Sequence, residues 1–332
     1  MKTLDPTVQT LYQDLVQQVH VPREQFGSVY VRRVKGTEYA YLKNPVGTVR
    51  RDIFLGRTDD DATQRRVNAI QLESRRARSR RWIVRALKSA GIPSPSDALG
   101  AVLDACADAG LHRHAVLVGT AAYQCYSAII GVTLPGSSMM TKDADLATAS
   151  LAISGIEASD TMEIILRRAD PTFAAVPGLD PQSLPSHFRS DNGFVVDLLT
   201  PQLRRTDPNP LPLKNLQAGA TPLQHLRWLI DTPIPAVALF GSGVPVAVPA
   251  PARFAIHKLI VAQKRTHDRP KRGKDLRQAH ALIEALQTAD PWALVDAYES
   301  ACAEGAQGWK TPITRSLREL QIDPARLALP PS

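Results

Sequence analysis

The feature that most restricts the fold of this 332-residue chain is an apolar strand that ends in Gly-Thr, followed by a helix and an Asp-x-Asp strand. Residues 114–120 read HAVLVGT, residues 121–131 read AAYQCYSAIIG and residues 141–147 read TKDADLA. Short apolar runs bounded by turn residues predict strands, and the longer run between them predicts a helix. With the strands and helices predicted elsewhere in the chain, these segments predict a fold that contains both element types, an α+β protein.

Three aspartates occupy positions where a lone carboxylate is unfavourable. Asp143 and Asp145 stand one residue apart, so on a strand their side chains point to the same face, with Cα atoms roughly 7 Å apart. Asp197 lies inside the apolar strand FVVDLL, residues 194–199, where an unpaired charge is costly. Solvent at an edge, a proton or a cation would relieve the repulsion. These residues therefore predict either a solvated pair or a metal site.

The Gly119-Thr120 corner leads from a strand into a helix. Such a corner offers backbone N–H groups and a hydroxyl to an anion, and glycine allows the anion to approach closely. An ordinary tight turn between a strand and a helix can have the same residues. Taken alone, the corner indicates a turn, and it indicates an anion site only in combination with the three aspartates.

The rest of the pattern divides the chain into four segments. Residues 1–61 predict an amphipathic helix and a small antiparallel β-sheet, and residues 62–95 predict an arginine-rich helix. Residues 96–250 contain the strands with the aspartates. Residues 251–332 predict a C-terminal helical domain.

The basic residues gather in the arginine-rich helix. The chain has a net charge of +8, and residues 65–88 alone hold nine Lys and Arg against one acid, Glu73. A local basic stripe favours a polyanion such as RNA, and a solvated helix face explains it equally well. The candidate nucleic-acid-binding residues are Arg75, Arg76, Arg78, Arg80 and Arg81. The same two interpretations, nucleic-acid contact and ordinary sheet composition, apply to the tyrosines of the small sheet, Tyr30, Tyr39 and Tyr41.

Several other classes of protein find no support in the sequence. No apolar run approaches the roughly 20 residues needed to span a bilayer, and residues 1–15 lack the apolar segment of a signal peptide. Three cysteines without paired spacing argue against a disulfide framework or a zinc knuckle, and they indicate buried, reduced thiols. A G-x-S-x-G motif of a serine hydrolase is missing from the sequence. We therefore expect a cytoplasmic protein without a membrane partner.

In combination, LVGT at residues 117–120, the Asp-x-Asp strand and the later FVVDLL strand resemble the DNA polymerase β superfamily of nucleotidyltransferases. The chain is most similar to bacterial nucleotidyltransferase-domain proteins, which combine these motifs with a small N-terminal sheet and an HKL…KR…KDL pattern, here within residues 257–276. Nucleotidyltransferase toxins of abortive-infection systems share that last pattern. The resemblance spans residues 27–286 and implies a polymerase-β-type nucleotidyltransferase core, in which helices pack on a mixed sheet.

The resemblance also implies the site residues and their roles. The implied catalytic and metal-binding residues are Asp143, Asp145 and Asp197. The implied nucleotide-binding residues are Gly119, Thr120, Lys258, Lys274 and Asp275. The aspartates would hold a pair of Mg²⁺ ions, with Mn²⁺ as an alternative, and Asp197 would accept the proton of the attacking hydroxyl. Lys258 and Lys274 would neutralise the triphosphate, and Asp275 would orient a lysine or the nucleotide.

The sequence therefore predicts a Mg²⁺-dependent enzyme that transfers a nucleoside monophosphate from an NTP to a hydroxyl. RNA or tRNA is the favoured acceptor because of the basic helix, and a protein or a small molecule is an alternative acceptor. An antitoxin protein is an expected partner if the chain acts in a toxin-antitoxin or phage-defence system. The alternative from another class is a catalytically idle nucleotidyltransferase fold that binds nucleic acid. The three retained aspartates argue against that alternative.

Overall fold

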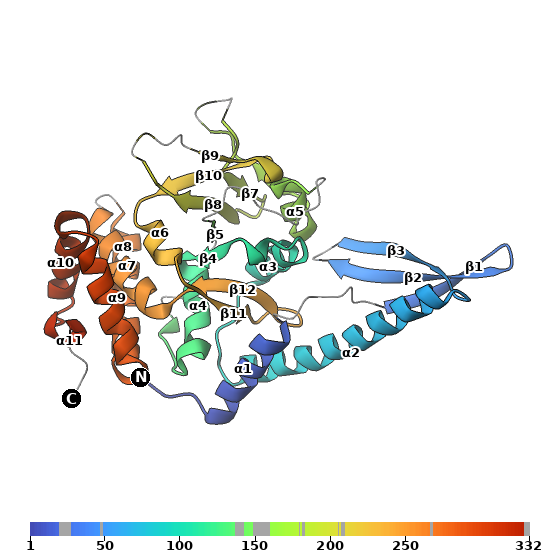
Figure 1. Ribbon diagram of the computed structural model, residues 1–332, viewed down its shortest axis with the longest axis horizontal. Coiled ribbons are helices and arrows are strands. Elements are labelled where there is room, and N and C mark those ends of the chain that lie inside the picture. The colour runs from blue at the N-terminus through green and yellow to red at the C-terminus, as the bar shows by residue number, and fades with distance from the viewer. Residues whose placement is uncertain are drawn as a thin grey trace.

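The computed structural model describes residues 1–19, 28–46, 49–136, 143–148, 160–178, 180, 183–204, 206, 210–265 and 268–328. Figure 1 shows three parts of the molecule. An arm made of a three-stranded sheet and one long helix extends from one end, a mixed sheet with helices lies in the middle, and the C-terminal helices lie at the other end.

Nine strands of the described chain form the central sheet, in the order β11-β12-β4-β5-β8-β10-β9, with β7 added to β8 and β6 added to β7. Their bounds are β4 (Val116–Val118), β5 (Asp143–Ala147), β6 (Ala174–Ala175), β7 (His187–Arg189), β8 (Val195–Pro201), β9 (Leu211–Leu213), β10 (Ala218–Leu223), β11 (Pro233–Ala238) and β12 (Val244–Pro249). Strands β5, β8 and β10 are parallel, whereas β4 is antiparallel to β5. The first half of β8 therefore lies between β5 and β7.

Helices cover this sheet and form the C-terminal part of the molecule (Figure 1). Their bounds are α1 (Pro6–Val19), α2 (Asp61–Ser89), α3 (Asp97–Asp108), α4 (Gly119–Ile130), α5 (Met162–Ala169), α6 (Leu226–Ile230), α7 (Pro251–Lys264), α8 (Arg269–Ala289), α9 (Pro291–Ala303), α10 (Thr311–Glu319) and α11 (Ala325–Ala328). Polar side chains begin two of the helices. Asp60 accepts a hydrogen bond from the backbone N–H of Thr63 at the start of α2, and Ser96 accepts one from Leu99 at the start of α3.

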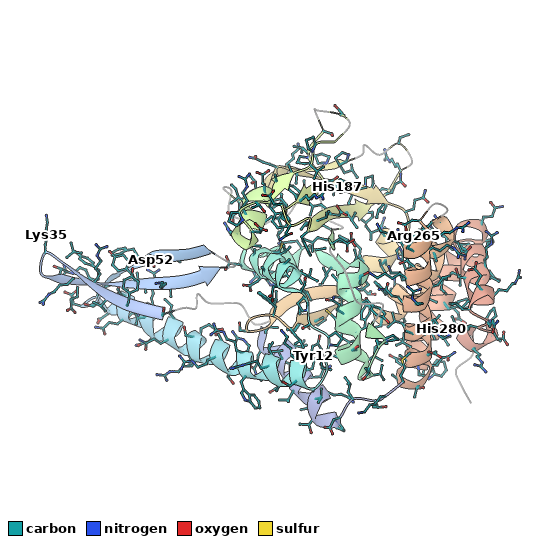
Figure 2. The ribbon with its side chains drawn as sticks, turned by 180° about the vertical axis from the view of Figure 1, so that it is seen from behind. Tyr12, Lys35, Asp52, His187, Arg265 and His280 are labelled. Atoms are coloured by element: carbon teal, nitrogen blue, oxygen red, sulfur yellow. The ribbon has the colours of Figure 1, made fainter. Side chains whose placement is uncertain are left out.

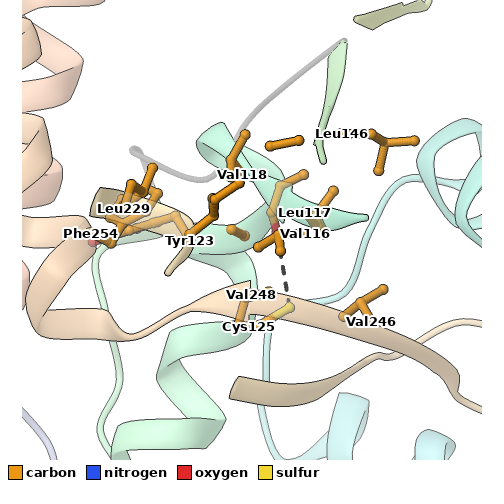
Figure 3. Close-up of a cluster of buried hydrophobic side chains, with 14 of the residues drawn as sticks. Val116, Leu117, Val118, Tyr123, Cys125, Leu146, Leu229, Val246, Val248 and Phe254 are labelled. Carbon is orange, nitrogen blue, oxygen red and sulfur yellow. Dashed lines mark hydrogen bonds between the residues drawn. The ribbon is translucent and has the colours of Figure 1, made fainter. Parts of the chain in front are cut away.

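The main hydrophobic core includes residues from α3 to α11, and Figure 3 shows the part of it around β4 and α4. Tyr126 of α4 packs edge-on against Phe254 of α7, with ring centroids 5.1 Å apart, and its hydroxyl donates to the carbonyl of Pro249 at 3.0 Å. These contacts join α4, which carries Gly119 and Thr120, to α7, which carries Lys258. Cys106, Cys125 and Cys302 form no disulfide, and Cys106 and Cys125 are buried as the sequence predicts, whereas Cys302 is only partly buried.

We call residues 28–89 the arm: β1 (Ser28–Val34), β2 (Thr37–Val46), β3 (Val49–Arg57) and α2. The three strands form an antiparallel sheet in the order β1-β2-β3. One face of this sheet buries Ala40, Leu42 and Leu55 against Ile70 of α2. The far end of α2 packs on α1 in a second cluster that includes Leu87. The long helix thus connects the small sheet to the rest of the molecule.

These elements confirm the predicted α+β fold with its small N-terminal sheet, arginine-rich helix and C-terminal helices. The predicted strand at residues 141–147 is observed from Asp143, and residues 141 and 142 lie outside the described residues. Among the described residues, no helix combines the length and the apolar character needed to cross a lipid bilayer.

Candidate active site

Strands β5 and β8 bring the three predicted aspartates to one patch of the sheet. The strands are parallel neighbours, and the backbone of Asp145 lies directly opposite that of Asp197. Asp143 stands two residues before Asp145 on the same strand, so both side chains point to the same face. Neighbouring strands are about 4.8 Å apart. Acids that are distant in the sequence therefore become neighbours in the first half of β5 and β8.

The Asp145 carboxylate is placed among like charges. Loss of solvation raises the pKa of Asp145 from 3.8 to about 6, and the negative charges of Asp143 and Asp197 add to the shift. The positive charges of Lys258 and Lys271 act in the opposite direction. The patch therefore has an excess of negative charge that a bound cation would neutralise.

Gly119 makes room for the Asp145 carboxylate. A β-carbon built on Gly119 would lie 2.1 Å from Asp145 Oδ2, which is far inside van der Waals contact. The backbone of Gly119 also has a φ of +64°, in the left-handed region where other residues are strained. Both observations require glycine at the point where β4 ends and α4 begins. The predicted phosphate corner and the predicted acidic site are thus in direct contact.

The first turn of α4 lies at this corner. The first N–H groups of an α-helix have no acceptor within the helix, and Val118, the residue before α4, provides no side-chain acceptor for them. The N-terminal end of a helix carries a partial positive charge that favours anions. Thr120 is buried in this turn, and its hydroxyl accepts a 3.5 Å hydrogen bond from Gln278 Nε2 of α8. Helix α8 is thereby connected to the corner.

Asp275 joins two cations beside the acidic patch. Its Oδ1 accepts a hydrogen bond from Lys258 Nζ at 2.5 Å, and its Oδ2 accepts one from Arg265 Nε at 2.6 Å. Lys258 is only 8% exposed and Asp275 only 3%, so each depends on the other for charge compensation. Lys258 Nζ also lies 5.2 Å from the centroid of the Phe254 ring. Asp275 thus holds Lys258 at a defined position from which its charge acts on Asp145.

Two further lysines come from the first turns of α8. Loss of solvation lowers the pKa of Lys274, and the charge of the nearby Asp143 opposes that change. Lys271, which sequence reasoning did not select, acts on Asp145 through its charge. Together with Lys258 they provide positive charge next to the three acids, an arrangement that suits a ligand with both phosphates and cations.

The chemistry of the donor set fits a hard divalent cation. The candidate ligands are carboxylate oxygens on adjacent strands, which Mg²⁺ and Mn²⁺ prefer to nitrogen or sulfur. Within the part of the chain that the structure describes, no three Asp, Glu, His or Cys side chains already surround a common point. The Asp197 carboxylate contacts His187 instead. A cation would thus have to draw the carboxylates closer together.

His187 is a site residue that sequence reasoning missed. Its Nδ1 is in hydrogen-bond contact with Asp197 Oδ1. The contact follows from the antiparallel β7–β8 hairpin, in which His187 lies directly opposite Asp197. The signal was available in the sequence, because the SDNG turn at residues 190–193 fixes the register of the two flanking strands.

The five candidate arginines of α2 differ in their exposure to solvent. Arg75, Arg76, Arg78 and Arg81 are exposed to solvent on α2. Arg80 is only 4% exposed, and its guanidinium donates to Glu73 Oε1 at 2.6 Å in a buried ion pair. The inclusion of Arg80 among the nucleic-acid-binding residues is therefore corrected, because its side chain faces inward on the stripe that also buries Ala77 and Val84.

Comparison with known proteins connects this geometry to a family. A family model described as Nucleotidyltransferase matches residues 97–303, which is more than half of the chain. Among curated protein sequences, none matches this chain. Among solved structures, the chain is similar to an antigenic nucleotidyltransferase-like protein from Paracoccidioides brasiliensis, with a TM-score of 0.39 and 15% sequence identity over 71% of this chain and 94% of that one. On the match of the family model, this chain belongs to the nucleotidyltransferase family.

Proposed function

We propose that this chain is a Mg²⁺-dependent nucleotidyltransferase that transfers a nucleoside monophosphate from an NTP to a hydroxyl acceptor, with RNA or tRNA favoured. The observation that carries the proposal is the placement of Asp143, Asp145 and Asp197 on the neighbouring strands β5 and β8, with Asp145 against the Gly119 corner. Membership of the family supports nucleotide transfer at the general level.

Divalent cations are generally used by nucleotidyltransferases of this family. Asp143, Asp145 and Asp197 would hold them, because carboxylate oxygens on two adjacent strands suit Mg²⁺ and also Mn²⁺. When bound, such ions neutralise charge on the entering and leaving oxygens of a phosphoryl displacement. The raised pKa of Asp145 supports this assignment, because it reflects first the loss of solvation and then the negative charges of Asp143 and Asp197, and a bound cation would offset both.

The residues around the acids would complete the reaction. The acceptor oxygen would form a bond to the α-phosphorus as the bond to pyrophosphate breaks, and Asp197 would take the hydroxyl proton. His187 would orient the Asp197 carboxylate through their hydrogen bond. Lys258 and Lys274 would pair with the charge of the leaving pyrophosphate, while the N–H groups at Gly119 and Thr120 would bind phosphate oxygens.

RNA is favoured as the acceptor because of the arm. Residues 28–89 contain 16 Lys and Arg against 6 Asp and Glu, an excess of positive charge that is larger than that of the whole chain. Arg75, Arg76, Arg78 and Arg81 lie exposed on α2. Exposed guanidinium groups at this density favour contact with a phosphate backbone.

A label-transfer assay tests the proposal. The full chain is incubated with each α-³²P-labelled NTP in turn, MgCl₂ and total RNA, and the RNA is separated on a denaturing gel. We expect label on RNA with wild type and with the control Asp296→Ala, which removes an exposed acid of α9, and none with Asp143→Ala. RNA binding by the wild type without label transfer from any NTP to RNA, protein or small molecule would favour the catalytically idle alternative.

The resemblance to abortive-infection toxins adds a proposed biological setting. If the chain is a toxin with a cognate antitoxin protein, its induced expression should arrest the growth of a bacterial host. Expression of Asp143→Ala should leave growth unchanged. Equal growth of cultures that express wild type and Asp143→Ala would remove the toxin assignment and leave the transfer reaction to be judged by the labelling assay.

A further inference from the structure

Aromatic side chains cover the outer face of the small sheet in the arm. Tyr30 of β1 stacks on Tyr41 of β2, with ring centroids 5.6 Å apart and planes inclined by 20°. Phe54 of β3 contacts Tyr41 at 5.5 Å and Tyr39 at 5.8 Å. We call these four residues the aromatic face. It lies opposite the side of the sheet that buries Leu42 against α2.

The aromatic face has no part in the core of the arm. The core consists of residues on the other side of the sheet. Phe54 is 55% exposed and Tyr30 is 37% exposed, so parts of these rings remain open to solvent. Exposed neighbouring aromatic rings are typical of a binding surface, because removing their apolar area from water upon binding lowers the free energy of the complex.

The charge of the arm restricts the partner. Residues 28–89 contain 16 basic and 6 acidic residues, whereas the rest of the chain contains more acidic than basic residues. Arg32 and Lys43, both exposed, each follow an aromatic residue by two positions on the same strand, so they lie on the same face as the rings. The side chains of Arg50 and Arg51 lie outside the described residues. Asp52 of β3, opposite Lys43, is an acid on the same face, and Arg32 and Lys43 together outweigh its charge. Rings beside a net positive charge fit a polyanion whose units have flat faces.

We propose that the aromatic face binds an unpaired stretch of nucleic acid, with bases stacked on Tyr30, Tyr41 and Phe54 and phosphates beside Arg32 and Lys43. Base–aromatic stacking and cationic side chains along the backbone are the two components of single-strand recognition. This inference rests on the proposed function, which favours RNA as the acceptor. It adds a surface that would bind the RNA at a distance from the three aspartates.

The shape of the arm agrees with this assignment. Figure 2 shows Lys35 at the far tip of the arm and Asp52 closer to the body of the molecule. A single strand that follows the sheet would run from the tip toward the body. A duplex would conceal its base faces, so the aromatic face should discriminate against it.

Fluorescence anisotropy with a labelled, unstructured 12-nucleotide RNA tests the inference. The full chain carries Asp143→Ala, and the buffer contains EDTA, so binding is measured without nucleotide transfer. We expect Phe54→Ala to weaken binding by about 5- to 150-fold, the range of one lost base–ring stack, and Tyr30→Ala to weaken it as well. Phe54→Tyr keeps a ring and should remain within about twofold of the parent.

Trp292→Ala provides the matched control, because it removes another exposed aromatic ring, 63% exposed, from helix α9 outside the arm. Its affinity should equal that of the parent. A DNA strand of the same sequence shows whether the aromatic face binds RNA or DNA. The face is assigned to the nucleic acid that binds more tightly, provided that Phe54→Ala weakens the binding of that nucleic acid. A duplex should show no loss of affinity with Phe54→Ala.

Equal single-strand affinity of Phe54→Ala, Tyr30→Ala and Trp292→Ala would overturn the inference. Self-association of the parent that disappears in Phe54→Ala, measured by analytical ultracentrifugation, would also overturn it by assigning the face to a second copy of the chain. The proposed function is tested separately. If the chain transfers nucleotide but binds RNA independently of Phe54, the proposed function stands and the inference is wrong. If RNA binding depends on Phe54 but no nucleotide is transferred, the inference stands and the proposed function is wrong.

Discussion

Asp145 of β5 and Asp197 of β8 stand directly opposite each other on parallel strands, and Asp143 precedes Asp145 on the same face. Like charges at this spacing repel, and the repulsion contributes to the raised pKa of Asp145. The folded chain therefore stores an unfavourable interaction at the candidate site, which a stability measurement can detect.

Asp145→Asn should stabilise the metal-free protein. The change of the Asp145 pKa from 3.8 to about 6 corresponds to roughly 1–3 kcal/mol of unfavourable interaction when the carboxylate is ionised. Asparagine has nearly the same shape without the charge. Urea unfolding at pH 7.5 in EDTA should show a free energy of unfolding higher by that amount. A lower value would mean that Asp145 is stabilised by its surroundings.

The same pKa shift determines a pH dependence. A carboxyl with a higher pKa in the folded chain binds its proton more tightly when folded, so protonation favours the folded state. The destabilisation by Asp145 is complete above about pH 6 and is lost as the pH falls from about 6 toward 3.8. The stability difference between Asp145→Asn and wild type should shrink over that window. A constant difference from pH 7.5 to pH 4 would contradict the shift.

Gly119→Ala should abolish nucleotide transfer. The new β-carbon would lie 2.1 Å from Asp145 Oδ2, so the carboxylate must move from its position. Gly241→Ala is the matched control, because Gly241 has a similar φ of +56° with no atom within 4 Å of the added carbon. Both variants should lose about 1 kcal/mol of stability from backbone strain. Label transfer should disappear only in Gly119→Ala, and equal activity of the two variants would show that the contact has no function.

Asp275→Ala should be strongly destabilising. Lys258, 8% exposed, would lose its counter-ion, and removal of one partner of a buried ion pair typically costs about 3–5 kcal/mol. Arg272→Ala breaks the more exposed ion pair with Glu319 and should cost only about 0–1 kcal/mol. Unfolding in urea measures both values. Similar losses in the two variants would show that burial of the Lys258–Asp275 pair does not govern its contribution.

The exposed arginines of α2 should determine the salt dependence of RNA binding. Replacement of Arg75, Arg78 and Arg81 by Gln removes up to three phosphate contacts and should reduce the slope of log affinity against log salt by about 2 for a single strand. A control with Arg315, Arg318 and Arg326 replaced by Gln removes the same charge from α10 and α11 at the other end of the molecule. An equal change of slope in both variants would indicate attraction by net charge alone.

Local patterns explain why much of the fold could be predicted. The strand, Gly-Thr corner, helix and Asp-x-Asp strand are each defined by neighbouring residues, so their type and order could be predicted from the sequence. The long helix that begins after Asp60 is likewise marked by its cap. The parallel pairing of β5 with β8 joins distant segments, and only the resemblance to a family suggested it.

The details that escaped prediction depend on tertiary packing. Arg80 belongs to the same basic segment as Arg78 and Arg81, but it lies on the buried stripe of α2 and pairs with Glu73, seven residues earlier. Its spacing from Ala77 and Val84 contained the correct signal. His187 required the register of a hairpin as well as its existence. Lys271 acts on Asp145 through space from another element, a relationship without any pattern in the sequence.

Binding of Mn²⁺ tests the central claim most directly, because the ion reports on the three carboxylates before any choice of acceptor. Electron paramagnetic resonance of the full chain with Mn²⁺ and a non-hydrolysable NTP should show bound ion in wild type and in the control Asp296→Ala. The bound signal should be lost in Asp143→Ala and in Asp197→Ala, because each variant removes a proposed ligand. Mn²⁺ affinity that is the same in Asp197→Ala as in wild type would contradict a cation site shared by β5 and β8.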